Sequence, residues 1–155
     1  MKRTFKNLLI PVLLIFVAAL TACSDDDKND NQTQGTLNAK IMVISDLHVM
    51  DPSLLIADGT AFQTYLASDR KMLKESVAIT ESMVNTIIAQ KPSILLVAGD
   101  LTKDGEKVSH EKVASILQKV KDAGIKVYVI CGNHDVNNPY AVSFNGETTT
   151  AVDQV

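Results

Sequence analysis

The stretch VYVICGNHDVNNP, residues 127–139, begins as a buried strand and changes character within a few residues. Its first four residues are apolar or β-branched, a composition typical of a strand inside a sheet. A Cys-Gly pair follows, and then come Asn133, His134 and Asp135 in succession. Side chains of these three types coordinate metals and move protons. The stretch therefore predicts a core strand that delivers chemical groups to a site at its carboxyl end.

Two earlier stretches end in the same way. KIMVIS, residues 40–45, leads into Asp46 and His48, and SILLVA, residues 93–98, leads into Asp100. Ligands of open parallel sheets sit outside the carboxyl ends of the strands, so these groups converge if the three strands are neighbours. Carboxylates, imidazoles and an amide oxygen suit divalent cations such as Mn, Fe, Zn or Mg. A glycine precedes the polar group in two of the strands, where it allows close backbone approach or unusual dihedral angles.

Two segments between these strands carry apolar residues at helical spacing. The first helix is expected roughly over residues 69–90, and Pro92 ends it. The second is expected from Ser109, which suits the N-cap, to Gly124, which suits the C′ position. The stretch before the first helix, with its Pro and Gly, is expected to be a loop. The order β-α-β-α-β predicts an α/β fold with a parallel sheet covered on both faces.

The N-terminal residues carry a targeting pattern. Residues 1–22 combine a basic start with an apolar run that is too short to span a bilayer, which takes about 20 residues. The stretch LTAC, residues 20–23, resembles the cleavage box of bacterial lipoproteins. This resemblance implies cleavage before Cys23 and lipidation of that cysteine. An ordinary signal peptide, or an anchor helix with an incidental cysteine, is the alternative.

Residues 23–38 are polar and rich in Asp, Asn and Gln, which predicts a disordered acidic tether after the lipidated cysteine. Its SDDD opening resembles an acidic signal of some Gram-negative outer-membrane lipoproteins, although a plain linker would have a similar composition. We therefore expect an outer-membrane lipoprotein on the periplasmic or cell-surface side, held to the membrane by its lipid. With a net charge of -3, no nucleic-acid surface is evident. The oligomeric state is unknown from the sequence.

Taken together, the three strand-end motifs resemble the first three motifs of the calcineurin-like metallophosphoesterases. They are Asp46-x-His48, Gly99-Asp100 and Gly132-Asn133-His134-Asp135. The resemblance covers about residues 40–145. It implies that residues 39–155 are the N-terminal part of a layered α/β metallophosphoesterase domain, with only the first β-α-β-α-β portion present.

This resemblance implies a two-metal hydrolase of phosphomonoesters or phosphodiesters with a metal-bound hydroxide as nucleophile. Asp46 and His48 would bind the first of two divalent metal ions. Asp100 would bridge both ions, and Asn133 would bind the second. The substrate would be a phosphoester that the sequence does not name.

The resemblance also implies that His134 protonates or stabilises the leaving-group oxygen and that Asp135 orients His134. The family completes its site with later histidines. The sequence has three histidines, and none follows Asp135. The alternative function is therefore a catalytically incomplete lipoprotein with a binding or surface-interaction role.

Five other positions carry simpler expectations. Cys131, at the end of an apolar strand, is expected to be a small buried hydrophobe. His110, near a helix N-terminus, is expected on the surface. Asp104 is expected to make a turn with the glycine after it. Arg70 and Lys71 could meet a phosphate, but solvated helix positions are the simpler expectation.

Overall fold

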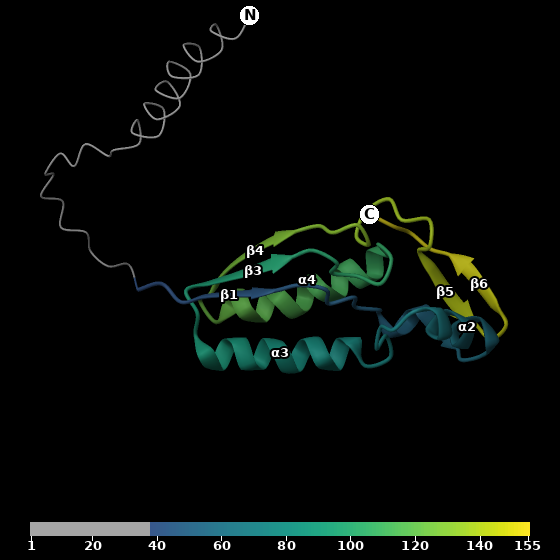
Figure 1. Ribbon diagram of the computed structural model, residues 1–155, viewed down its shortest axis with the longest axis horizontal. Coiled ribbons are helices and arrows are strands. Elements are labelled where there is room, and N and C mark those ends of the chain that lie inside the picture. The colour runs from purple at the N-terminus through teal and green to yellow at the C-terminus, as the bar shows by residue number, and fades with distance from the viewer. Residues whose placement is uncertain (1–37) are drawn as a thin grey trace, which may run out of the picture. The chain divides into compact units, whose positions relative to one another are not determined.

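The structure is a computed structural model that describes residues 38–155. The predicted signal peptide, the lipidation site Cys23 and the acidic tether up to residue 37 lie outside the described residues. The described elements, in chain order (Figure 1), are β1 (Ile41–Ile44), the 3-10 helix η1 (Pro52–Leu54), β2 (Leu55–Ala57), α2 (Thr60–Ser68), α3 (Ser76–Gln90), β3 (Ile94–Ala98), α4 (Lys107–Asp122), β4 (Lys126–Ile130), β5 (Val142–Asn145) and β6 (Thr148–Ala151).

The three predicted strands form one parallel sheet in the order β1-β3-β4. The central strand, β3, pairs with β1 from Ile41 opposite Ile94 and with β4 from Ile94 opposite Lys126. This pairing confirms the predicted parallel sheet. It also brings the carboxyl ends of all three strands to one edge.

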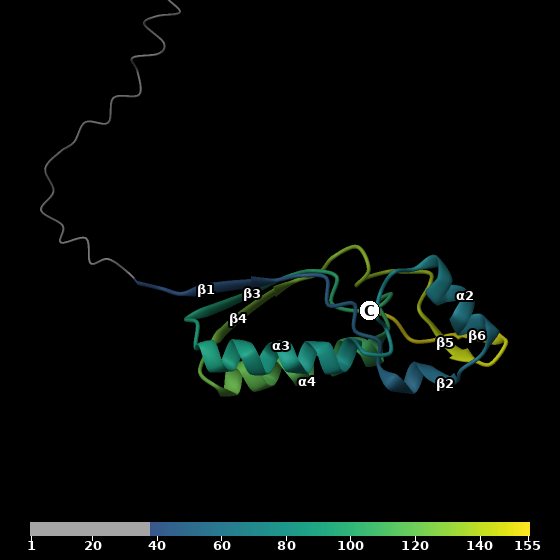
Figure 2. The same ribbon diagram turned by 60° about the horizontal axis from the view of Figure 1, so that its bottom comes forward.

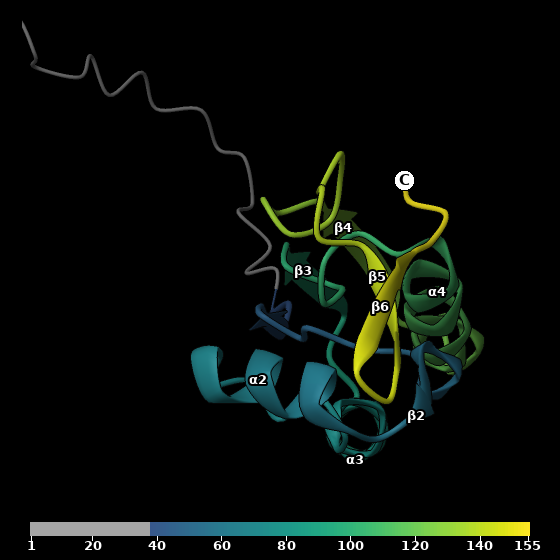
Figure 3. The same ribbon diagram turned by 90° about the vertical axis from the view of Figure 1, so that its right-hand side faces the viewer.

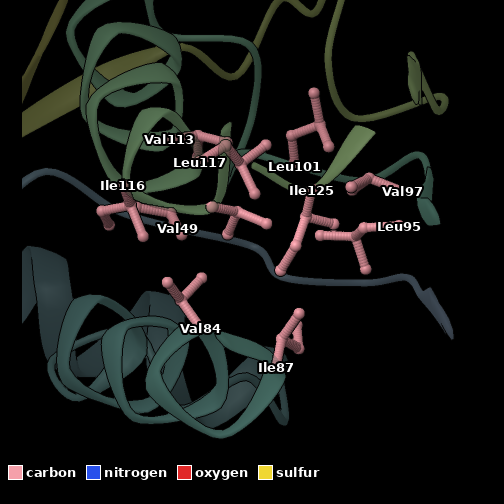
Figure 4. Close-up of a cluster of buried hydrophobic side chains, with 11 residues drawn as sticks. Val49, Val84, Ile87, Leu95, Val97, Leu101, Val113, Ile116, Leu117 and Ile125 are labelled. Carbon is pink, nitrogen blue, oxygen red and sulfur yellow. The ribbon is translucent and has the colours of Figure 1, made fainter. Parts of the chain in front are cut away.

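Both long helices pack against the same face of this sheet (Figures 1 and 2). Their apolar stripes meet the inward side chains of the strands in one core (Figure 4), which contains Val49, Val84, Ile87, Leu95, Val97, Leu101, Val113, Ile116, Leu117, Val120 and Ile125. Burial of this much apolar surface is the main force that holds the helices to the sheet. The prediction of a sheet covered on both faces is therefore wrong for the described residues.

The other face of the sheet carries exposed apolar side chains. Val43, Leu96 and Tyr128 lie opposite one another across the three strands and are 63%, 37% and 58% exposed. Cys131, just after β4, is also exposed, so its predicted burial is wrong. An apolar strand predicts burial only where another layer covers it, and no described element covers the face that carries Val43, Leu96 and Tyr128.

A second sheet, of order β2-β5-β6, forms where the sequence suggested only a loop and the end of the chain. β2 pairs in parallel with β5, and β5 and β6 form an antiparallel hairpin beside α2 (Figure 3). A second apolar core lies under this unit, with Met50, Leu54, Phe62, Leu73 and Phe144 buried. The short strands and the α2 helix lack a clear period in the sequence, which is why they were not predicted.

The first long helix begins later than expected. Asp69 is the C-cap of α2, and α3 starts only at Ser76. The Ser76 hydroxyl donates to the carbonyl of Leu73 at 2.8 Å and accepts from the backbone N–H of Met50 at 3.0 Å. The helix ends as predicted, because Lys91 adopts a left-handed conformation at its C-cap and Pro92 follows.

The second long helix, α4, begins at Lys107, so the predicted N-cap at Ser109 is wrong. Ser109 is buried inside the first turn, where its hydroxyl accepts from the backbone N–H of Asp51 at 3.1 Å. Gly124 follows the helix with φ 82°, as the predicted C′ position requires. Among residues 38–155, no helix combines the length and apolar character needed to cross a membrane.

Candidate metal centre

The site lies at the carboxyl edge of the parallel sheet, where backbone hydrogen bonds continue past the strands. The N–H of Asp46 donates to the carbonyl of Gly99 at 3.2 Å, and the N–H of His48 donates to the carbonyl of Asp100 at 2.9 Å. These bonds keep the loops after β1 and β3 in register. The two loops therefore hold their polar residues side by side.

Three residues of this edge have unusual backbone conformations. Asp46, His48 and Asp100 have φ values of 57°, 42° and 50°, in the left-handed region. Such a conformation costs a non-glycine residue about 1–3 kcal/mol and clusters at functional sites. The chain bends here in order to turn these side chains towards one another.

The side chains do converge. Nε2 of His48 lies 3.8 Å from Oδ1 of Asp46 and 3.9 Å from Oδ2 of Asp100. His48, Asp100 and His134 each offer a ligand atom within 4.8 Å of the other two. The rings of His48 and His134 meet edge to face with centroids 4.9 Å apart. Thus the polar residues that follow three different strands lie close together: Asp46, His48, Asp100 and His134.

Nε2 of the His48 ring is left without a close hydrogen-bond acceptor among residues 38–155. Nδ1 is buried and has no hydrogen-bond partner among the described residues, and the carboxylates near Nε2 are too distant to accept one. Burial, and next the charge of Lys71, lower the pKa of His48. A neutral imidazole with an unused nitrogen is the form that binds metals.

Glycines make the close approach of the loops possible, as the sequence predicted. A Cβ on Gly132 would overlap the backbone nitrogen and the carboxylate of Asp100. Gly99 has φ 81°, and a Cβ there would lie 2.8 Å from the backbone nitrogen of Gly132. Only glycine fits where the loops after β3 and β4 touch. The backbone N–H of His134 then donates to Oδ1 of Asp100 at 3.1 Å.

The partner of His134 is Asp104, which the sequence had suggested only as a turn residue. Nδ1 of His134 lies 2.9 Å from the carbonyl oxygen of Lys103 and 3.0 Å from Oδ1 of Asp104. Both oxygens only accept hydrogen bonds, so Nδ1 carries the proton. Nε2 is consequently the nitrogen that can exchange a proton with a ligand.

Asp104 is itself fixed by buried groups. Its Oδ2 accepts from Nζ of Lys103 at 2.7 Å and from the Tyr65 hydroxyl at 2.8 Å. Lys103 is fully buried and also pairs with Glu106 at 2.8 Å. Burial acts to raise the pKa of Asp104, but the bonds from Lys103, Tyr65 and His134 outweigh it and keep the pKa below its usual value. The carboxylate therefore stays charged beside the imidazole.

Asp135 makes no hydrogen bond to the His134 ring within residues 38–155, and its predicted role in orienting His134 stays a prediction. Its Oδ1 accepts from the N–H groups of Leu101 and Thr102 at 2.8 and 2.9 Å and from the Thr102 hydroxyl at 3.0 Å. Its Oδ2 accepts from the N–H of Gly132 at 2.7 Å. Burial acts to raise the pKa of Asp135, but these bonds together hold it below its usual value. Asp135 thus ties the loops after β3 and β4 together.

Asn133 and His110 lie at the same turn as His134. Asn133 is exposed at the start of the turn that carries His134, and its side chain makes no hydrogen bond within residues 38–155. His110 was expected on the surface, but it is half-buried and its Nε2 donates to the carbonyl of Asp135 at 2.7 Å. His110 therefore braces the same turn from α4.

The donor set fits a divalent cation. Two ligand atoms that are each about 2.0–2.2 Å from one ion can lie up to about 4 Å apart. The distances from His48 to the carboxylates of Asp46 and Asp100 fall in this range. Carboxylate oxygens with imidazole and without thiolates suit Mn, Fe, Zn or Mg. The unpaired nitrogens of His48 support the same conclusion.

The chain belongs to a known family of metal-dependent enzymes. Residues 39–152 match the family described as calcineurin-like phosphoesterase. The match covers the parallel sheet, both long helices, the second sheet and every residue of the cluster. It confirms the family that the three strand-end motifs indicated.

A relative supports this assignment over a shorter range. A protein of Ruthia magnifica subsp. Calyptogena magnifica named "Probable cyclic nucleotide phosphodiesterase" is 40% identical over 58 residues. The match covers 37% of this chain and 24% of the relative. The chain thus spans about a quarter of the length of this relative.

Proposed function

We propose that this protein hydrolyses phosphomonoesters or phosphodiesters with two divalent metal ions. The observation that supports this most directly is the convergence of Asp46, His48 and Asp100 after two neighbouring parallel strands, with His134 beside them after the third. Family membership and the printed name of the relative point to the same chemistry. Cyclic nucleotides are therefore one class of phosphodiester to test.

In this proposal Asp46 and His48 would hold the first cation, Asn133 would hold the second, and Asp100 would contribute its carboxylate to both. When bound, the two cations would polarise the phosphoryl group and lower the pKa of a water molecule. The bridging role suits Asp100 because two close dications repel each other unless an anion lies between them.

The remaining chemistry belongs to His134. With its proton on Nδ1 fixed by Asp104 and the carbonyl of Lys103, the ring presents Nε2 for proton exchange. We propose that a protonated Nε2 donates to the leaving-group oxygen. The fixed position of the adjacent Asp104 carboxylate keeps the ring oriented.

We also propose that the protein is anchored outside the cytoplasm, at the bacterial outer membrane, through lipid on Cys23. The proposal rests on the LTAC stretch and the acidic residues after it. Labelling with radioactive palmitate in the native host tests it, because Cys23→Ser should remove the label.

The central experiment measures hydrolysis by the full chain with Mn²⁺ added. Bis(4-nitrophenyl) phosphate, 4-nitrophenyl phosphate and cyclic AMP serve as a model diester, a monoester and a cyclic diester. We expect Mn²⁺-dependent turnover that Asp100→Asn abolishes, with folding retained because the amide oxygen can still accept from His134. Asp122→Asn, on an exposed residue of α4, is the matched control.

Two results would contradict the proposal. Turnover that survives Asp100→Asn would remove the assigned site. Absence of turnover in a chain that has bound Mn²⁺ would favour the alternative, a catalytically incomplete protein with a binding role.

A further inference from the structure

Lys71 lies in the connection between α2 and α3 and is held by one carboxylate at two points. Its Nζ lies 3.0 Å from Oδ2 of Asp69, and its backbone N–H donates to Oδ1 of the same residue at 3.1 Å. The two side chains are 17% and 22% exposed. The ammonium is therefore more fixed than that of a solvated helix lysine.

The position of Lys71 links it to the metal centre. Lys71 lines an open hollow of about 160 Å³ together with Asp46, His48, Met72 and Ser76. The connection between α2 and α3 thus contributes one wall of the hollow that Asp46 and His48 also line.

Lys71 is paired with Asp69 but keeps N–H donors that this carboxylate does not use. On its own, Lys71 would repel a metal ion bound by Asp46 and His48. A lysine ammonium has three N–H donors, and Asp69 is its single carboxylate partner within 4.0 Å among the described residues. The remaining N–H donors of Lys71 can bind an oxyanion that also contacts the metal ions. Such an oxyanion is attracted both by the ammonium and by the metal ions.

We propose that Lys71 binds a phosphoryl oxygen of the substrate and that Asp69 is a positioning residue for it. This inference rests on the proposed function of the same site. It distinguishes Lys71 from Lys74, three residues later, which is more exposed and pairs with Asp58 at 2.6 Å.

The test is calorimetric titration of inorganic phosphate into the full chain loaded with Mn²⁺, after a separate titration of Mn²⁺ alone. Lys71→Met should weaken phosphate binding at least tenfold and leave Mn²⁺ binding unchanged or tighter, because a like charge is removed. Lys71→Arg, which keeps the charge, should restore most of the phosphate affinity. Lys74→Met removes the same charge from the same segment and should match the wild type.

A second variant, Asp69→Asn, should weaken phosphate binding less than Lys71→Met, since it loosens the ammonium without removing it. Equal phosphate affinity in Lys71→Met and wild type, with Mn²⁺ bound to both, would overturn the role of Lys71 alone. Equal weakening in Lys71→Met and Lys74→Met would also overturn it, because net charge would then explain the effect. Failure of the wild-type chain to bind Mn²⁺ would instead overturn the proposed function and this inference with it.

Discussion

Replacement of Asp135 by alanine should destabilise the protein by about 4 kcal/mol. The carboxylate accepts four hydrogen bonds, two of them from the buried N–H groups of Leu101 and Thr102. A buried donor left without an acceptor costs about 1–3 kcal/mol, which gives about 2–6 kcal/mol for these two groups. Gly132 is less buried, so water can replace part of its bond. The expected loss is a large share of the 5–15 kcal/mol by which a domain of this size is stable.

Urea unfolding followed by circular dichroism measures this loss directly. Asp135→Asn should cost only about 2 kcal/mol, because its amide oxygen can keep the three bonds of Oδ1 while its NH₂ group faces the N–H of Gly132. Asp122→Ala, on the exposed surface of α4, should change stability by less than about 0.5 kcal/mol. A loss below about 1 kcal/mol for Asp135→Ala would refute the reasoning that this carboxylate joins the two loops.

Three further predictions follow from the same region. Gly132→Ala should lower the free energy of unfolding by about 1–3 kcal/mol and weaken Mn²⁺ binding, because the new Cβ would displace Asp100. Unchanged Mn²⁺ affinity in a titration would contradict this. Asp104→Asn should lower kcat for a phosphodiester about 10- to 100-fold with little change in KM, and a raised KM at constant kcat would count against its role in positioning His134. On acidification, the urea midpoint should stay flat above about pH 5 and fall below about pH 4. In the folded state the pKa values of Asp104 and Asp135 lie below the 3.8 of an unperturbed carboxyl. The stability that these two carboxylates contribute is therefore lost as the pH falls through their folded-state pKa values. A urea midpoint that already declines above pH 5 would mean that other titrating groups control the stability.

The parallel sheet and the metal-ligating residues could be read from local sequence. Short apolar runs separated by amphipathic helices have one favourable packing, with strands in parallel and their carboxyl ends together. Asp46, His48 and Asp100 follow those strands directly, so their convergence needed only the strand order. The glycine before Asp100 was also informative, since a close approach of two backbones excludes a Cβ.

The arrangement of the layers could not be read in this way. An apolar strand records a preference for burial but does not say which element provides it. In the described residues both helices cover one face, Tyr128 on the other face is exposed, and Cys131, just after β4, is exposed as well. The second sheet was missed for a related reason, because its strands have three or four residues each and too few positions to show a period.

The sequence by itself therefore determined the chemistry at the ends of three strands, because the residue types and their place after a strand are local properties. Only the tertiary structure decided which groups serve one another. Asp135 is adjacent to His134 in the chain, yet the turn directs its carboxylate to backbone N–H groups, and the ring is held by Asp104 from another loop. Lys71 likewise reaches the site only through the path of the chain between two helices. Contacts between distant segments depend on the packing of the whole domain, which no short stretch of sequence encodes.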